Sequence, residues 1–201
     1  MEAAHCDSLS DPDLVTRLGN GDQQALVGLF RRRRVEVYRF ALHMTGLEAT
    51  AEDVTQEVFI TVMREAARYD ASRGTVIAWL LGIARNLVRR RFERERFVQP
   101  LDLSAHDHAP VECDPLLDLA RAERIALIRR AVMSLPPRYR EVVLLCDLQE
   151  LSYADTAGAL GCAVGTVRSR LHRARALLAT KLREVETSKP ALPVRSTRCL
   201  A

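Results

Sequence analysis

The sequence predicts an all-α protein with two small helical domains that are joined by a flexible acidic linker. Apolar residues recur at the three- and four-residue spacing of one helix face in several segments. They make up 48% of the chain while aromatic residues make up only 5%, a mixture that suits helices packed through aliphatic side chains better than sheets. An acidic, proline-containing segment divides the 201 residues near their middle, and each half is long enough to bury a core.

The first domain is expected to span residues 14–97 and to begin with a long helical segment. Apolar positions repeat at helical spacing from Asp22 to Met44, which predicts either a helix pair or one long helix. The run from Arg31 to Arg34 interrupts this pattern, and we expect it to be exposed to solvent.

Two more helices are expected in this domain, on either side of a glycine-containing break. Thr50 and Asp53 have the spacing of a capping box, and an apolar stripe follows them. The sequence Ser-Arg-Gly at residues 72–74 then breaks the helical pattern. Thr75 can cap the next helix, which is apolar on one face and ends in arginines.

Residues 98–114 are expected to form the linker, and a second domain is expected to span residues 115–186. The linker and the residues just after it contain three prolines and five acidic residues but no Lys or Arg. Asp114 followed by Pro115 is typical of a helix start. The tail at residues 187–201 contains two more prolines and is expected to be disordered.

The second domain carries a helix-turn-helix pattern. Ser152 and Asp155 have capping-box spacing at the start of one helix, and Gly161 ends it. A longer helix is expected from Val164 to about Val185, apolar toward the first helix and strongly basic on the other side. A helix that enters the major groove needs small residues near the DNA backbone and long donors near its N-terminus. The residues expected on these grounds to contact DNA are Gly165, Thr166, Arg168, Ser169, His172 and Arg173.

An alternative interpretation of this basic helix is an ordinary solvated face, which is the usual meaning of an isolated arginine run. Here a helix cap, a glycine turn and a basic second helix occur together. This combination favours contact with DNA.

Several stretches of the chain also resemble a known family. The second domain is similar to the fourth conserved region of the extracytoplasmic-function (ECF) sigma factors in the stretches 134–142, 151–153 and 164–170. The first domain is similar to the second region of that family in the stretches 52–59 and 79–86. The two matches occur in the order and spacing of the family and together cover about residues 14–184.

The resemblance implies that the first domain docks on bacterial core RNA polymerase and melts promoter DNA at the minus-ten element, while the second reads the minus-thirty-five element. It assigns polymerase binding to Asp53, Gln56 and Glu57. Their spacing gives them a common polar face that can meet a basic helix. Without the resemblance, an acidic solvated face is the default interpretation. The resemblance also implies that the linker follows the RNA exit path of the polymerase.

Recognition of the minus-ten element is assigned by the resemblance to a loop that Asn86 opens, because an amide can pair with the edge of an unstacked base. Arg89, Arg90 and Arg91 follow and supply positive charge for a single-stranded backbone.

The resemblance implies three partners, namely core RNA polymerase, promoter DNA and a restraining anti-sigma factor, in a stress or envelope response. We expect no cofactor, no metal site and no small-molecule substrate. His106, His108 and Cys113 are an alternative zinc site, disfavoured because a structural zinc ion usually has four ligands at tighter spacing.

Two other functional classes compete with a non-catalytic specificity subunit. A stand-alone helix-turn-helix repressor or activator explains only residues 134–184. An enzyme acting on nucleic acid is disfavoured because the chain has neither a phosphate-binding glycine-lysine loop nor an HExxH motif.

Two further features of the chain predict its compartment. No basic start followed by an apolar run is present, and no stretch approaches the ~18 apolar residues that span a membrane, so a cytoplasmic location is expected. The five cysteines are odd in number and form no CxxC pair, which favours reduced thiols.

Overall fold

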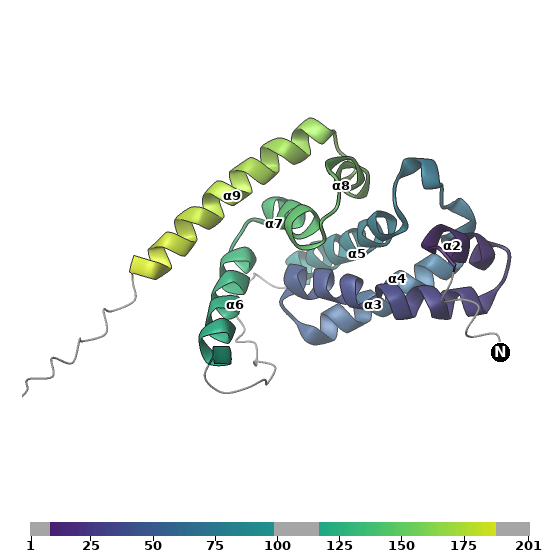
Figure 1. The fold of residues 1–201 in the computed structure, drawn as a ribbon, viewed down its shortest axis with the longest axis horizontal. Helices are drawn as coiled ribbons and strands as arrows, with labels where there is room; N and C mark the ends of the chain where they lie inside the picture. The colour runs from purple at the N-terminus through teal and green to yellow at the C-terminus, as the bar shows by residue number, and fades with distance from the viewer. Residues whose placement is uncertain (1–8, 99–116, 188–201) are drawn as a thin grey trace, which may run out of the picture.

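The computed structural model describes residues 9–98 and 117–187, and every regular element within these two ranges is helical (Figure 1). The α-helices are α2 (Asp11–Gly19), α3 (Gln23–Thr45), α4 (Glu48–Glu65), α5 (Val76–Val98), α6 (Leu117–Met133), α7 (Pro137–Val143), α8 (Tyr153–Leu160) and α9 (Val164–Thr187). Two 3₁₀ turns, η1 (Ala66–Arg68) and η2 (Ala71–Arg73), connect α4 to α5, and a π-helical turn, η3 (Leu144–Leu148), continues α7. The all-α prediction is confirmed.

The predicted linker and tail lie outside the described residues, apart from Val98 at the end of α5 and Thr187 at the end of α9. Asp114 and Pro115, at the predicted helix start, lie outside them as well, and so do His106, His108 and Cys113.

Helix α2 begins at Asp11, ahead of residue 14, where the first domain was predicted to start. The Ser10 hydroxyl accepts a hydrogen bond from the backbone N–H of Asp13 at 3.4 Å. In return, the Asp13 carboxylate accepts a hydrogen bond from the backbone N–H of Ser10 at 3.3 Å. This reciprocal pair satisfies two of the N–H groups that a helix start leaves open.

Helix α3 is one continuous helix rather than a pair, and its arginine run is only half exposed. Arg33 donates through Nε to the Asp11 carboxylate at 2.6 Å, and Arg32 donates to the same carboxylate at 3.2 Å. Asp11 is 11% exposed. The expectation of a fully solvated run is therefore wrong for these two residues, because they attach α2 to α3.

Helix α4 begins earlier than predicted. Gly46 ends α3 in the left-handed conformation at φ 77°, and the extended Leu47 leads directly into α4 without a side-chain cap. Thr50 and Asp53 thus lie inside the first turns, so the capping box predicted for them is wrong. Only Gly46 and Leu47 separate α3 from α4, so α4 has already begun before it reaches Thr50. The turn that ends α3 at Gly46 therefore sets the start of α4, and the capping preference of Thr50 does not.

The helix-turn-helix prediction is confirmed by α8 and α9. The Ser152 hydroxyl accepts the backbone N–H of Asp155 at 3.0 Å, and Gly161 ends α8 in the left-handed conformation at φ 63°. Glycine adopts this conformation without the strain that a side chain would add.

Replacing Ser152 by alanine is expected to lower the free energy of unfolding by about 1 kcal/mol, because the first turn of α8 loses its cap. Urea unfolding followed by circular dichroism measures this change. Ser169→Ala, which removes an exposed hydroxyl inside α9, is the matched control and is expected to change the free energy by less than about 0.5 kcal/mol. An equal loss for both variants would contradict the cap.

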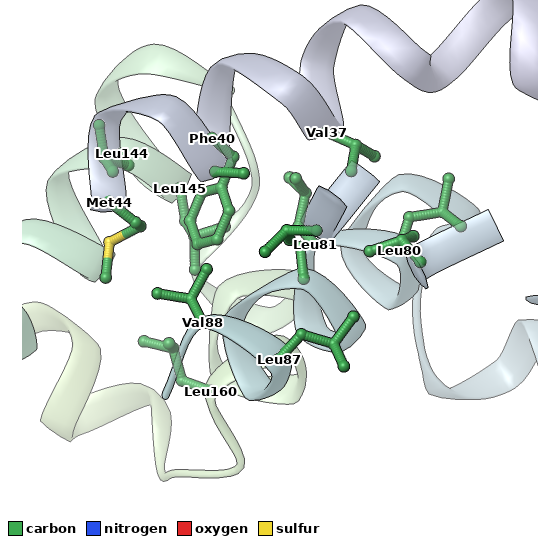
Figure 2. Close-up of a cluster of buried hydrophobic side chains, with 14 of the residues drawn as sticks. Val37, Phe40, Met44, Leu80, Leu81, Leu87, Val88, Leu144, Leu145 and Leu160 are labelled. Atoms are coloured by element: carbon green, nitrogen blue, oxygen red, sulfur yellow. The ribbon is translucent and has the colours of Figure 1, made fainter. Parts of the chain in front are cut away.

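The hydrophobic core continues from one predicted domain into the other. Figure 2 shows Val37, Phe40 and Met44 of α3 beside Leu80, Leu81, Leu87 and Val88 of α5, Leu144 and Leu145 of η3, and Leu160 of α8. These side chains are almost fully buried in one cluster. The two predicted domains therefore pack directly against each other, although the sequence predicts a flexible linker between them.

A partly buried arginine adds polar contacts to this shared core. Arg140 of α7 donates to the backbone oxygen of Met44 near the end of α3 at 2.7 Å, and to the oxygens of Leu135 and Met133. Carbonyl groups at the C-terminal ends of helices lack intrahelical partners, and a cation there also complements the helix dipole. Burial lowers the pKa of Arg140.

Candidate nucleic-acid and polymerase interfaces

The six residues predicted to read DNA lie along one side of α9. Val167, Leu171 and Ala174 form the opposite side of the helix, where they are fully buried against the rest of the domain. Helical geometry therefore turns the polar residues outward. The recognition face consists of Gly165, Thr166, Arg168, Ser169, His172 and Arg173, all exposed except the half-buried Thr166. The structure thus brings together all the residues that the sequence predicted for this site.

Two tyrosines outside the predicted set of site residues border the recognition face. The guanidinium of Arg168 lies 5.8 Å from the ring centroid of Tyr153, at the start of α8. A hydrogen bond from Arg173 lowers the pKa of Tyr139, and the guanidinium of Arg138 lies 4.8 Å from the same ring. Aromatic contacts of this kind restrict long arginine side chains. Arg138 and Tyr139 are adjacent in the stretch 134–142, which resembles the fourth conserved region of the family, so the sequence could have pointed to this tyrosine.

Not every arginine of α9 is available to DNA. Arg175 donates to the two carboxylate oxygens of Asp147 in η3, at 2.6 Å and 3.2 Å. This fork-like pair raises the pKa of Arg175 and holds its side chain toward the protein. Arg168 and Arg173, in contrast, are exposed on the recognition face.

The acidic face of α4 is exposed as predicted. Asp53, Gln56 and Glu57 all point to solvent, while Val54 and Val58 are buried. A single surface therefore presents two carboxylates and one amide.

Arg91 of α5 lies against this acidic face. Its guanidinium pairs with Asp53 at 3.3 Å and with Glu57 at 3.6 Å. Arg91 is 27% exposed, about half as much as the two acids. Arg90, Arg91 and Arg94 line a surface pocket of about 290 Å³ with Glu57 and Leu87.

Asn86, Arg89 and Arg90 lie on a helix, so the loop expected to open at Asn86 is wrong. Helix α5 runs without a break from Val76 to Val98. Spacings of three and four residues place these exposed side chains on one face, which we call the α5 DNA face. Arg91 is on another side of the helix, with the acidic face of α4. The good helix formers after Leu87 explain why the segment stays helical.

The α5 DNA face has its own polar contacts. Arg89 pairs with Glu93 at 3.1 Å, and both side chains are mostly exposed. The amide oxygen of Asn86 accepts a hydrogen bond from Nη1 of Arg85 at 3.2 Å. The amide nitrogen of Asn86 is a donor, so the side chain can still offer a hydrogen bond to a base.

No group of three or more His, Cys, Asp or Glu side chains that could hold a metal ion occurs within residues 9–98 and 117–187. Burial raises the pKa of the Cys146 thiol, whose sulfur lies 3.4 Å from Oγ1 of Thr156. Among the helices that the structure describes, none has the length and apolar character needed to cross a membrane.

Two family models match the chain, one in each half. The model of Sigma-70 region 2 matches residues 29–98, and the model of Sigma-70 region 4 matches residues 125–178. The first match contains the acidic face of α4 and the α5 DNA face, and the second contains the recognition face.

Related proteins agree with both models. The ECF RNA polymerase sigma factor SigE of Mycolicibacterium smegmatis is 36% identical over 193 residues, covering 87% of this chain and 73% of SigE. The ECF RNA polymerase sigma factor SigM of Mycobacterium tuberculosis is 37% identical over 182 residues, covering 89% of this chain and 87% of SigM.

A solved structure has the same fold. The complex of the sigma factor RpoE with the anti-sigma factor NepR from Bartonella quintana matches with a TM-score of 0.64 and 25% identity, over 77% of this chain and 94% of the matched chain. Both family models, the identity over most of each relative and this shared fold lead to one assignment. The chain belongs to the ECF sigma factors of RNA polymerase.

Proposed function

We propose that this ECF sigma factor binds core RNA polymerase through the acidic face of α4, reads the minus-ten element with the α5 DNA face, and reads the minus-thirty-five element with the recognition face of α9. The observation that carries this proposal is the exposed polar side of α9 opposite its buried stripe, in a helix-turn-helix. Together these surfaces supply promoter specificity, while the chemistry of RNA synthesis belongs to the polymerase.

Recognition of the minus-thirty-five element rests on the chemistry of the α9 residues. Gly165 and Thr166 are small enough for the helix start to approach the DNA backbone, and Arg168 and Arg173 are long enough to reach base edges. Arginine is the side chain that most often reads guanine in the major groove. Phosphate contacts from neighbouring residues would fix the register without reading sequence.

Recognition of the minus-ten element rests on the α5 DNA face. An asparagine amide offers both a donor and an acceptor to the edge of an unpaired base. Arg89 and Arg90 lie one turn further along and supply charge for the adjacent phosphates. The ion pairs of Arg91 favour a different role, in which it orders Asp53 and Glu57 for the polymerase.

A restraining anti-sigma factor is a further proposed partner, and the site of action is the cytoplasm, where bacterial polymerase meets the chromosome. Support for the partner comes from the matched RpoE structure, which is a complex with an anti-sigma factor. A stable complex isolated from native cells would support it. Full activity of the protein in those cells without any such complex would contradict it.

Promoter binding with and without core polymerase tests the proposed function directly. A sigma factor holds two short DNA-reading surfaces at a separation that the polymerase sets, so strong promoter binding requires the polymerase. Fluorescence anisotropy of a labelled promoter should show weak binding by the free protein and tight binding by the holoenzyme. Equally tight binding by the free protein would favour a stand-alone regulator instead.

Asn86→Ala is expected to reduce open-complex formation by about tenfold, since an amide contact to a base contributes roughly 1–3 kcal/mol. Permanganate footprinting of the minus-ten region measures opening, and anisotropy measures polymerase binding. Gln56→Ala is the reciprocal control, because it removes an exposed amide from the acidic face and should weaken polymerase binding instead. Loss of polymerase binding by Asn86→Ala would place Asn86 in the docking surface.

A further inference from the structure

A basic pocket, which we call the arginine pocket, lies where the acidic face of α4 meets the α5 DNA face. It has a volume of about 290 Å³, and its lining combines one acid of α4 with one apolar residue and three arginines of α5, namely Glu57, Leu87, Arg90, Arg91 and Arg94. Leu87 is 7% exposed, while Arg90 and Arg94 are fully open to solvent. Three cations and one anion line the pocket, so positive charge is in excess there.

The lining of the arginine pocket fits a phosphate group. Guanidinium groups bind phosphate oxygens through paired N–H donors, and they lose their water more easily than an ammonium group does. A water molecule takes about 30 Å³ in the liquid, so the pocket has room for a phosphate group with some of its water. An apolar ligand is disfavoured, because Leu87 is the one apolar side chain among the described residues that line the pocket.

The position of the pocket points to the backbone of promoter DNA as the source of this phosphate. Arg90 belongs both to the pocket and to the α5 DNA face, and it lies about 6 Å along the helix from Asn86. A single strand whose base reaches Asn86 would therefore pass the pocket with a neighbouring phosphate. Proteins that hold single strands commonly combine contacts to bases with a cationic track for the backbone.

The acidic face competes with DNA for the pocket in the free protein. Glu57 lines the pocket, and its carboxylate pairs with Nη2 of Arg91 at 3.6 Å. Nη1 of Arg91 pairs with Asp53 at 3.3 Å. The two carboxylates repel an incoming phosphate and hold one of the arginines that would bind it. They are 50% and 63% exposed, so these ion pairs are weak and can exchange partners.

We propose that the arginine pocket binds a backbone phosphate of the promoter strand at the minus-ten element, and that polymerase docking on Asp53 and Glu57 makes the pocket available. A basic partner on the acidic face neutralises the two carboxylates and takes them from Arg91, which can then turn to the phosphate. Arg91 thus serves the acidic face in the free protein and DNA in the holoenzyme. This inference rests on the proposed function of the acidic face and the α5 DNA face.

Neutral replacements on the acidic face test the competition without polymerase. The double variant Asp53→Asn with Glu57→Gln keeps the shape of both side chains and removes their charge. In fluorescence anisotropy, the free variant should bind labelled single-stranded oligothymidine about tenfold more tightly than the wild type, since the pocket has lost its own anions. Adding Arg94→Ala to the double variant should remove most of this gain, because Arg94 lines the pocket.

Glu48→Gln with Glu52→Gln is the matched control, because it removes two exposed charges from α4 outside the lining of the pocket. It should change the affinity for oligothymidine by less than about threefold. Thermal unfolding checks that every variant keeps the fold. An equal gain with this control, no gain with the first double variant, or a gain that survives the loss of Arg94 would overturn the competition.

The salt dependence of promoter binding tests the pocket in the holoenzyme. Each phosphate contact to a single strand adds about 0.7 to the slope with which log affinity falls against log salt concentration. Arg94→Ala should lower the slope by about that amount, while Arg68→Ala, which removes an exposed arginine from η1, should leave the slope unchanged. An unchanged slope with Arg94→Ala would overturn the role of the pocket in promoter binding. Failure of the wild-type holoenzyme to bind any promoter would overturn the proposed function, and this inference with it.

Discussion

Replacing Phe40 by alanine is expected to lower the free energy of unfolding by about 3–5 kcal/mol. Phe40 is 1% exposed, and Figure 2 shows its ring among side chains of α5 and η3. Its removal deletes a large apolar group and leaves a cavity that rigid helices on several sides cannot fill. Because these helices belong to both domains, unfolding should remain one cooperative transition in the wild type. Urea unfolding followed by circular dichroism measures both properties.

Val35→Ala is the matched control for Phe40, since Val35 lies on the same helix but is 41% exposed. It should change the free energy of unfolding by less than about 1 kcal/mol. Equal losses for the two variants, or separate transitions for the two domains in the wild type, would contradict a core that both domains share.

Arg168→Ala and Arg173→Ala are each expected to weaken recognition of the minus-thirty-five element by about 1–3 kcal/mol if the side chain reads a base. Both guanidiniums are on the exposed side of α9 and are bordered by Tyr153 and Tyr139. Competition of holoenzyme with matched and altered minus-thirty-five elements measures the effect. A loss confined to the matched element indicates base reading, and a uniform loss indicates phosphate contact.

Arg175→Ala is the control for these variants, because it removes the same charge from the same helix. Its guanidinium is held by Asp147, so promoter recognition should change little. Thermal unfolding checks that all three variants keep the fold. Unchanged recognition by Arg168→Ala and Arg173→Ala, or an equal loss with Arg175→Ala, would contradict the assignment of the recognition face.

The recognition face and the acidic face could be predicted from the sequence because each depends on one helix. Helical spacing decides which residues point outward, and it does so correctly for Asp53, Glu57, Arg168 and Arg173. Ser152 and Gly161 mark their helix ends with local chemistry that the structure confirms. Helix periodicity and capping rules therefore predict a surface or a helix end correctly when the interacting groups lie within a few residues of each other in the sequence.

The helix starts and the domain contact depend on partners far along the chain. Arg140 binds the oxygen of Met44 across 96 residues, and Asp155 binds Thr75 across 80. No periodicity in the sequence predicts such pairs. Arg32 and Arg33 likewise have the pattern of a solvated run in the sequence, because their ion-pair partner, Asp11, lies more than 20 residues away. The periodicity predicts a helix that passes through Asn86 and ends in arginines, and the structure confirms it; only the family resemblance placed the start of a loop at Asn86.

Transcription from genomic DNA fragments with purified bacterial core polymerase, with and without this protein, tests the central claim most directly. Mapping of the transcript starts should give new starts that appear only with the protein and share two upstream elements at a constant spacing. That result would confirm promoter direction and supply the sequences that the α5 DNA face and the recognition face read. Absence of new starts, together with tight duplex binding by the free protein, would contradict the account.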